Sequence, residues 1–394
     1  MNDSVCFHNG TVLTGFSVME HCSVLVQDGK IEDVFSEKRF AQKRFDPSVR
    51  IIDVGGAWIA PGFIDTHIHG FAGWGTEDRH PDSIIGMSRA LAAFGVTAFN
   101  PTLYPSEPDT LIESIRAVVA AMGREDGARI MGIHLEGPFI SPEKLGVQRP
   151  ETISAVDLAL MDRIWEASEG HIVNMTVAPE LKGMRELALY CMRKRIVLQA
   201  GHTNALYEHM VEGMQAGILH STHLFNAMSQ MHHRNPGAVG AVLIHPEISC
   251  EVIADGVHVH PDLVKLLFRD KPLDRVVLVT DALKPTEQPG GKLIANGEEV
   301  VYHDGCFHRK IDDVIAGSAL TMIAGVRNLI SFGLPIENAV KCASMNPAGI
   351  MKYPGQGALI PGYDADLVIF DAQYAVLATV IKGVLKKNLL EGQV

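Results

Sequence analysis

Between residues 61 and 355, short apolar runs alternate with helical patterns, and this alternation constrains the fold more than any other feature of the sequence. Eight runs have the character of strands: 63–67, 97–101, 129–136, 172–178, 196–202, 218–223, 250–255 and 276–281. Helical stretches such as 109–122, 155–167 and 184–193 lie between them. Parallel strands that are buried on both faces appear in a sequence as continuous apolar runs. Eight strand–helix units therefore predict an α/β fold, a TIM (β/α)8 barrel over residues 61–355, with later helices at 319–332 and 336–343 packed outside it.

The two ends of the chain have a different pattern. Residues 1–60 contain short β-branched runs with turns at Asp28-Gly29 and Gly55-Gly56. The last part of the chain returns to this pattern, with strand-like runs at 366–370 and 376–381. We therefore expect residues 1–60 and 356–394 to form one small β-sandwich domain, which is discontinuous in the sequence.

The composition narrows the range of partners. The formal net charge is −12, whereas a nucleic-acid or membrane-surface binder needs a basic face. No apolar run approaches the roughly 18 residues needed to cross a bilayer, and the N-terminus lacks a signal-peptide pattern. The six cysteines form no CxxC pair. We therefore expect a cytoplasmic protein with reduced thiols that binds neither nucleic acid nor membranes.

Polar residues follow the ends of the predicted strands, where barrel enzymes place their catalytic groups. The first strand leads into His67 and His69, whose side chains point the same way along a strand and can share a metal ion. The pair alone is weak evidence, because 18 histidines among 394 residues give about one such pair by chance. Its weight comes from its position on the first strand, beside the other strand ends.

Three further strand ends carry Glu136, His202 and His223. One carboxylate and two imidazoles with an open position are typical of a catalytic site for a divalent metal. Asp281 follows the eighth strand and could take a proton from a metal-bound water and return it to a leaving group. The alternative for Asp281 is a structural cap of the next segment.

Two basic residues lie in the loops that follow the sixth and seventh strands. Arg234 and His258 would supply positive charge near the mouth of the barrel. The planar fork of arginine suits a phosphate group. The alternative for Arg234 is a solvated surface cation, because arginine is usually exposed.

A set of short motifs covers nearly the whole chain. They are PGFIDTHIHG (61–70), HLEGPFISPEKLG (134–146), AGHT (200–203), THLFNAM (222–228), RNPG (234–237), IADGVH (253–258), VTDA (279–282), AGSALTM (316–322) and GYDADLVIFD (362–371). The set resembles the N-acetylglucosamine-6-phosphate deacetylases of the amidohydrolase superfamily. HxH and the barrel are shared across the superfamily, whereas LEGPF, HLFNAM, DGVH and AGSALTM together are specific to these deacetylases.

The resemblance implies a metal-dependent hydrolase that converts N-acetyl-D-glucosamine 6-phosphate to D-glucosamine 6-phosphate and acetate. It implies that the principal metal is held by Glu136, His202 and His223. A second metal, which only some family members hold, would lie at His67, His69 and Asp281. Asp281 would also be the general base and acid. Zinc is the metal we expect first, with iron or manganese as alternatives.

The resemblance also implies how the substrate, a small phosphorylated amino sugar, is held. The sugar phosphate would be bound by Asn226, Ala227, Arg234 and His258. The loops at Val147 and at Ile315, Ala316 and Gly317 would line the sugar pocket. The family further implies a homodimer, in which Arg234 could reach the site of the neighbouring subunit.

Gln148 departs from the family pattern, because many members carry a histidine in this turn. An amide can donate a hydrogen bond to a substrate oxygen but cannot become a cation. Our hypothesis is that a second metal at His67 and His69 takes over the polarisation of the acetyl carbonyl.

Other readings of the sequence remain open. The same chemistry on N-acetylgalactosamine 6-phosphate differs only in the epimer at C4, which no residue pattern decides. Another amidohydrolase, such as a deaminase, a cyclic-amide hydrolase or a D-aminoacylase, is a more distant alternative, and Arg234 with His258 favours a phosphorylated substrate. A non-catalytic scaffold would not need its metal ligands, whereas all the candidate ligands are present in this chain.

Overall fold

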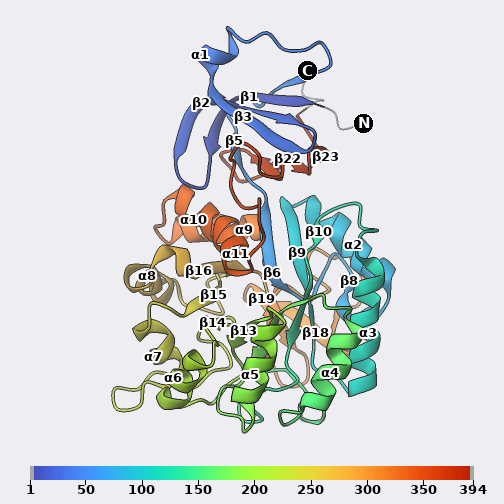
Figure 1. Ribbon diagram of the computed structural model, residues 1–394, viewed down its shortest axis with the longest axis vertical. Helices are drawn as coiled ribbons and strands as arrows, with labels where there is room; N and C mark the ends of the chain where they lie inside the picture. The colour runs from blue at the N-terminus through green and yellow to red at the C-terminus, as the bar shows by residue number, and fades with distance from the viewer. Residues whose placement is uncertain (1–3, 391–394) are drawn as a thin grey trace.

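The computed structural model describes residues 4–390, and its main body is a ring of parallel strands (Figure 1). The ring strands, in chain order, are β6 (Phe63–Ile68), β9 (Val96–Leu103), β10 (Arg129–Ile130) with β11 (Ile133–Glu136), β12 (Ile172–Val177), β13 (Val197–Ala200), β14 (His220–Ser221), β15 (Ser249–Ile253) and β16 (Val276–Val279). Neighbours in this order pair in parallel. The predicted TIM-type barrel is therefore confirmed, with the third strand divided into β10 and β11.

The ring closes where β16 meets β6. Beyond the regular strands, the backbone N–H of Asp281 donates to the carbonyl of His67 at 2.9 Å. Just before these two residues in the sequence, the Asp65 carboxylate accepts a hydrogen bond from Thr280 Oγ1 at 2.6 Å. The seam of the barrel thus lies directly beneath the segment that carries His67, His69 and Asp281.

Helices cover the outside of the ring (Figure 1). They are α2 (Pro81–Ala92), α3 (Pro108–Ala121), α4 (Leu158–Ala167), α5 (Met184–Arg193), α6 (Tyr207–Gln215), α7 (Gly237–Ile244), α8 (Pro261–Asp270), α9 (Met322–Ser331), α10 (Ile336–Ala343) and α11 (Met345–Ile350). Proline in the first turn of α2, α3 and α8 suits a helix start, where an N–H has no intrahelical partner. As expected, α9 and α10 pack outside the ring, against β16.

Side chains alternate along each ring strand and divide the barrel into two layers. In β11, Ile133 and Leu135 belong to the apolar cluster that lies between strands and helices. His134 and Glu136, between and after them, are buried on the opposite face of the strand. The apolar layer supplies most of the hydrophobic stabilisation, which leaves the inner face free to carry polar groups.

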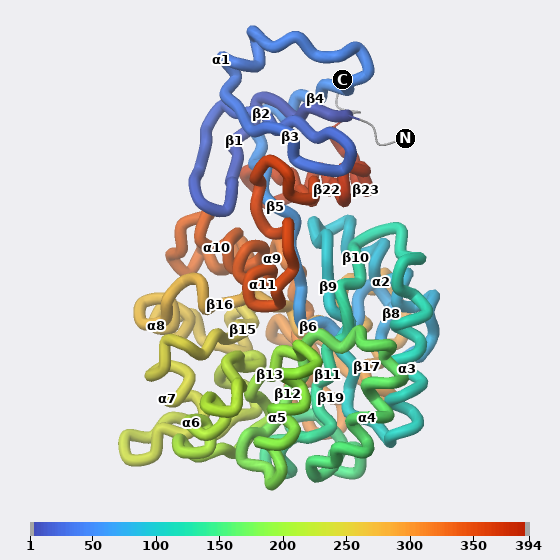
Figure 2. The backbone as a smooth tube through the Cα atoms, viewed as in Figure 1, coloured from blue at the N-terminus to red at the C-terminus, as the bar shows by residue number. Residues whose placement is uncertain are grey.

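A second sheet contains strands from both ends of the chain. Its order is β23-β22-β21-β5-β1-β2-β3, with β4 also paired to β1. The strands are β1 (Val5–Leu13), β2 (Val18–Gln27), β3 (Lys30–Ser36), β4 (Arg50–Asp53), β5 (Trp58–Pro61), β21 (Leu367–Phe370), β22 (Val376–Ile381) and β23 (Val384–Asn388), with the short helix α1 (Glu37–Phe40) beside them. Figure 2 shows the first and last strands together at one end of the molecule. The expected β domain of both chain ends is thus one branched sheet around its own apolar core.

A small sheet that the sequence did not suggest follows β16. It consists of β17 (Ile294–Ala295), β18 (Glu298–His303), β19 (Cys306–Arg309) and β20 (Ile315–Ser318). A hairpin of β7 (Gly70–Phe71) and β8 (Trp74–Gly75) follows β6. In the part of the chain from residue 4 to residue 390, no helix is both long and apolar enough to cross a membrane.

A largely buried ion-pair group joins the barrel to the branched sheet. The guanidinium of Arg129, at the start of β10, donates to Asp364 at 3.0 Å and also contacts Asp366, which precedes β21. The Asp366 carboxylate is only 5% exposed. Removal of one partner of a buried ion pair leaves a charge without compensation.

We predict that Arg129→Met lowers the free energy of unfolding by about 3–5 kcal/mol, because Asp366 is then buried without its cation. Asp366→Asn should cost clearly less, because Arg129 keeps its contact with Asp364. Urea denaturation of both variants measures the difference. Equal stability of Arg129→Met and the unmodified protein would contradict this account of the contact.

Candidate active site

A cavity of about 140 Å³ opens at the carboxyl ends of the barrel strands. It is lined by His69, Tyr104, Glu136, Gly146, Val147, Gln148, His202, His223, Asn226, Ala227, His258, Asp281, Ile315, Ala316 and Gly317. All the residues predicted for the site except Arg234 and His67 line this cavity. His67 lies behind the cavity wall, with its Nε2 3.4 Å from Glu136 Oε1, so only Arg234 lies away from the site. A larger cavity of about 780 Å³ lies at the opposite ends of the strands, near Ile196 and Arg275, away from these groups.

Glu136, His202 and His223 form the centre of the site. Glu136 is the last residue of β11, and the two histidines follow β13 and β14. Nε2 of His202 and Nε2 of His223 each lie 3.1 Å from Glu136 Oε1, and they lie 3.2 Å from each other. Three ligand atoms at such separations can surround one divalent cation.

His67, His69 and Asp281 lie against the other side of the Glu136 carboxylate. Nε2 of His67 is 3.4 Å from Glu136 Oε1, and Nε2 of His69 is 3.3 Å from Oε2. Asp281 Oδ1 lies 3.5 Å from the first of these nitrogens and 3.4 Å from the second. The same carboxylate can therefore take part in two neighbouring groups of metal ligands.

Hydrogen bonds to the far ring nitrogens show which atoms are free to bind a metal. Nδ1 of His202 lies 2.9 Å from the carbonyl of Lys144, which can only accept, so Nδ1 carries a proton. Nδ1 of His67 is held in the same way by the Glu251 carboxylate at 2.9 Å. In a neutral imidazole Nε2 then offers a lone pair, and Nε2 of His67 is buried without a hydrogen-bond partner. Buried lone pairs around a carboxylate fit a divalent cation.

The electrostatics of the site keep both carboxylates charged. Burial alone raises the pKa of Glu136, but His202, His223 and His67 outweigh it and hold that pKa well below its usual range. Burial likewise raises the pKa of Asp281, but His67 and His69 outweigh it and lower that pKa below its ordinary value. Asp281 is thus an ionised carboxylate at the wall of the cavity, which is the state that a proton acceptor needs.

The backbone is strained where it presents two of these side chains. His202 and Asp281 have φ values of 45° and 50°, in the left-handed region that costs a residue with a side chain on the order of 1–3 kcal/mol. Each is held by neighbours: Ser141 N–H donates to the carbonyl of His202, and Ser318 N–H donates to the carbonyl of Asp281 at 3.0 Å. Ser318 ends β20, so the unexpected small sheet fixes Asp281 and places Ile315, Ala316 and Gly317 beside it.

Gln148 contacts the metal ligands directly. Its Nε2 donates to Glu136 Oε2 at 2.6 Å, and its Oε1 is buried without a partner. The amide therefore orients the central carboxylate, a role the sequence did not suggest. One N–H of Nε2 already donates to Glu136. Donation to a substrate oxygen would therefore either break this bond or use the second N–H of the same amide.

The two predicted phosphate-binding residues have different surroundings. His258 lines the cavity, and its Nδ1 lies 2.5 Å from Asp255 Oδ2. Burial lowers the pKa of His258, but Asp255 outweighs it and raises that pKa above the usual value, which favours the cation. Arg234 is exposed in the loop before α7, where its side chain contacts His233. Within one subunit, the structure does not bring Arg234 to the cavity.

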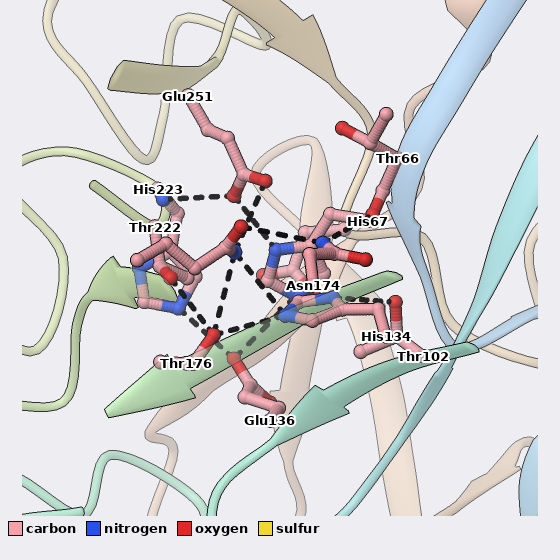
Figure 3. A network of polar contacts seen from close by, with 12 residues as sticks. Thr66, His67, Thr102, His134, Glu136, Asn174, Thr176, Thr222, His223 and Glu251 are labelled. Carbon is pink, nitrogen blue, oxygen red and sulfur yellow. Dashed lines mark hydrogen bonds and ion pairs between the residues drawn. The ribbon is translucent and has the colours of Figure 1, made fainter. Parts of the chain in front are cut away.

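Two further residues at the site were not predicted. Tyr104 follows β9; its ring stacks on His69 with centroids 3.9 Å apart, and its buried hydroxyl has no partner. Its position at the end of a predicted strand could have identified it from the sequence. Glu251 lies inside β15 and holds His67, as Figure 3 shows. The presence of a carboxylate within the apolar run 250–255 could have identified Glu251 from the sequence.

Comparison with known proteins agrees with this geometry. The model of the amidohydrolase family matches residues 58–389. The N-acetylglucosamine-6-phosphate deacetylase of Lysinibacillus sphaericus is 32% identical over 383 residues, which cover 96% of this chain and 97% of that protein. The N-acetylgalactosamine-6-phosphate deacetylase of Escherichia coli O157:H7 is also 32% identical, over 82% of this chain and 86% of that protein.

The solved structures show the same likeness in three dimensions. A mutant N-acetyl-D-glucosamine-6-phosphate deacetylase from Mycobacterium smegmatis, solved in complex with N-acetyl-D-glucosamine-6-phosphate, matches with a TM-score of 0.90 and 28% identity. The match covers 98% of this chain and 100% of the other chain. The resemblance drawn from the sequence motifs is thereby confirmed. The chain belongs to the amidohydrolase family.

Proposed function

We propose that this protein hydrolyses the acetamido group of N-acetyl-D-glucosamine 6-phosphate and releases acetate and D-glucosamine 6-phosphate. The observation that carries the proposal is the convergence of Glu136, His202, His223 and Asp281 on one cavity at the barrel mouth. Relatives with the same enzyme name cover nearly the whole chain, which supports the choice of substrate.

The residues divide into metal ligands and proton-transfer groups. Glu136, His202 and His223 would hold a divalent metal, and His67 and His69 with Asp281 would hold a second one. Such a metal, when bound, supplies Lewis acidity and lowers the pKa of water. Zinc suits this mixed carboxylate and imidazole set, and iron and manganese are the alternatives.

Asp281 is the residue we propose for both proton transfers. As water attacks the acetyl carbonyl carbon, the Asp281 carboxylate accepts a proton from it. The C–N bond then breaks, and Asp281 passes that proton to the departing amine nitrogen, which is a poor leaving group until it is protonated. Tyr104 and Gln148 carry N–H or O–H groups at the cavity wall and can donate to the substrate oxygens.

The phosphate would be met by His258 together with Arg234 from a second subunit. Apart from the imidazoles of the metal groups, His258 is the one basic side chain among the described residues that line the cavity. A dianionic phosphate favours more than one cation, and Arg234 is exposed and free to enter a neighbouring site. We therefore propose a homodimer.

We also propose a cytoplasmic enzyme, because all six cysteines are buried and unpaired.

The direct test of the proposed function is acetate release from four sugars. We expect turnover of N-acetyl-D-glucosamine 6-phosphate, with a much lower kcat/KM for the unphosphorylated sugar, because the cations at the mouth then have no partner. The 4-epimer, N-acetyl-D-galactosamine 6-phosphate, and its unphosphorylated form complete the set. Faster turnover of the galacto epimer would assign this chain the activity for which its Escherichia coli relative is named.

Asp281→Asn should lower kcat by about 10²–10⁴-fold, because the amide cannot accept the proton. The KM for the substrate should change little, since the amide has nearly the same shape. Steady-state kinetics with a coupled acetate assay measures both constants. Turnover near that of the unmodified enzyme would exclude Asp281 as the base.

Mixed dimers test whether Arg234 acts across subunits. Arg234→Ala and Asp281→Asn should each be nearly inactive alone. A refolded equimolar mixture should regain about a quarter of the normal activity, because half of the random dimers would contain one complete site. If Arg234 acted within its own subunit, the mixture would stay inactive.

A further inference from the structure

Glu251 is a carboxylate in the interior of the barrel, where the proposed reaction does not use it. It is the third residue of β15, and its side chain is completely buried (0% exposed). Cys250 and Val252, on either side of it, belong to the outer apolar layer, so the alternation of the strand turns Glu251 inward. A buried carboxylate is costly unless hydrogen bonds satisfy it. Its contacts therefore indicate why the barrel tolerates it.

Three hydrogen-bond donors contact the carboxylate directly, and Nε2 of His220 lies further away, 3.8 Å from Oε1. Oε2 lies 2.9 Å from Nδ1 of His67 and accepts from the backbone N–H of His223 at 3.2 Å. Oε1 accepts from Nε2 of Gln199 at 3.2 Å. Figure 3 shows Glu251 facing both His67 and His223 in one view. One carboxylate thus contacts a ligand residue from each of the two metal groups.

The contact with His67 decides which of its nitrogens can bind a metal. An ionised carboxylate can only accept, so the proton between the two groups lies on Nδ1 of His67. Nε2, on the other side of the ring, then keeps its lone pair and points at Glu136 and Asp281, at 3.4 and 3.5 Å. In addition, the negative charge of Glu251 raises the basicity of the imidazole and offsets the charge of a bound cation.

A glutamine at this position could not do the same. Its NH₂ group would have to face either the N–H groups of His67 and His223 or the amide of Gln199, which are donors in the present arrangement. If it faced His67, it would hold the tautomer in which Nε2 carries the proton, and that nitrogen could no longer bind a metal. In either orientation of the amide, the negative charge that Glu251 places beside His67 would be lost.

We propose that Glu251 is a positioning residue that makes His67 a metal ligand, and that it thereby determines whether this chain holds a second metal at His67, His69 and Asp281. The inference rests on the proposed metal-dependent function and adds to it a residue that touches neither substrate nor metal. In this view the HxH pair alone is not sufficient for a second site. The carboxylate on β15 completes it.

The test compares Glu251→Gln with the matched control Asp366→Asn. Both variants replace a buried carboxylate by its amide, but Asp366 pairs with Arg129, away from the cavity. Zn²⁺ is added back to metal-free protein in the presence of a chromogenic chelator, and bound metal per subunit is counted by elemental analysis. We expect Glu251→Gln to lose affinity for the second Zn²⁺ by about 10–100-fold, and the control to stay within about twofold.

His67→Asn separates positioning from damage to the fold. If Glu251 acts through His67, adding Glu251→Gln to His67→Asn should change Zn²⁺ affinity no further. Glu251→Asp, which keeps the charge but withdraws the oxygens by one methylene, provides a second readout should the amide variant fold poorly. We expect it to bind the second Zn²⁺ less tightly than the unmodified protein does.

The outcomes are distinguishable. Unchanged Zn²⁺ affinity in Glu251→Gln, or an equal further loss in the His67→Asn background, would overturn the role of Glu251 while the proposed reaction stands. An unmodified protein that binds no Zn²⁺ and releases no acetate would overturn the proposed function itself, and this inference with it.

Discussion

The carboxylate of Glu136 is the group on which the mouth of the barrel depends. Four imidazoles, from His67, His69, His202 and His223, approach it within 3.4 Å, and Gln148 donates to it. These residues come from four different strands or their loops, so the ring must close before they can meet. Burial lowers the pKa of His67, His69 and His202, but the neighbouring carboxylates outweigh it and raise all three pKa values above the ordinary value. Without a cation, protons on these imidazoles therefore offset the buried negative charge, and a divalent cation would take over that role.

Stability and reactivity are divided between the two faces of each strand. Residues such as Leu135, Met175 and Val252 pack against the helices in one continuous apolar cluster. The opposite face holds a polar network of amides, hydroxyls and imidazoles, among them His134, which lies 3.0 Å from Thr102 Oγ1 and 2.9 Å from Thr176 Oγ1. Burial lowers the pKa of His134 well below its usual value, so this ring is neutral. It can therefore fill space beside His67 without adding charge.

Much of the fold could be predicted because its signals are local. The run at 276–281 and the pattern at 184–193 identified β16 and α5, and strand ends identified Glu136, His202 and Asp281. The small sheet β17–β20 was missed because its strands are short and mix charged with apolar residues, as in Glu298–His303 and Cys306–Arg309. Glu251 was missed because its role depends on a contact with residue 67, distant in the sequence. Arg234 was predicted for the site, but within one subunit it lies in an exposed loop outside the cavity.

The branched sheet of both chain ends has a consequence for how the protein is made. β5 pairs with β1 on one edge and with β21 on the other, and it leads directly into β6, the strand that carries the HxH pair. During synthesis on the ribosome, one edge of β5 stays open until residues 367–370 emerge. All the barrel strands precede residues 367–370 in the sequence, so β21 becomes available only after them. Its docking covers an edge of β5 that could otherwise pair with another nascent chain.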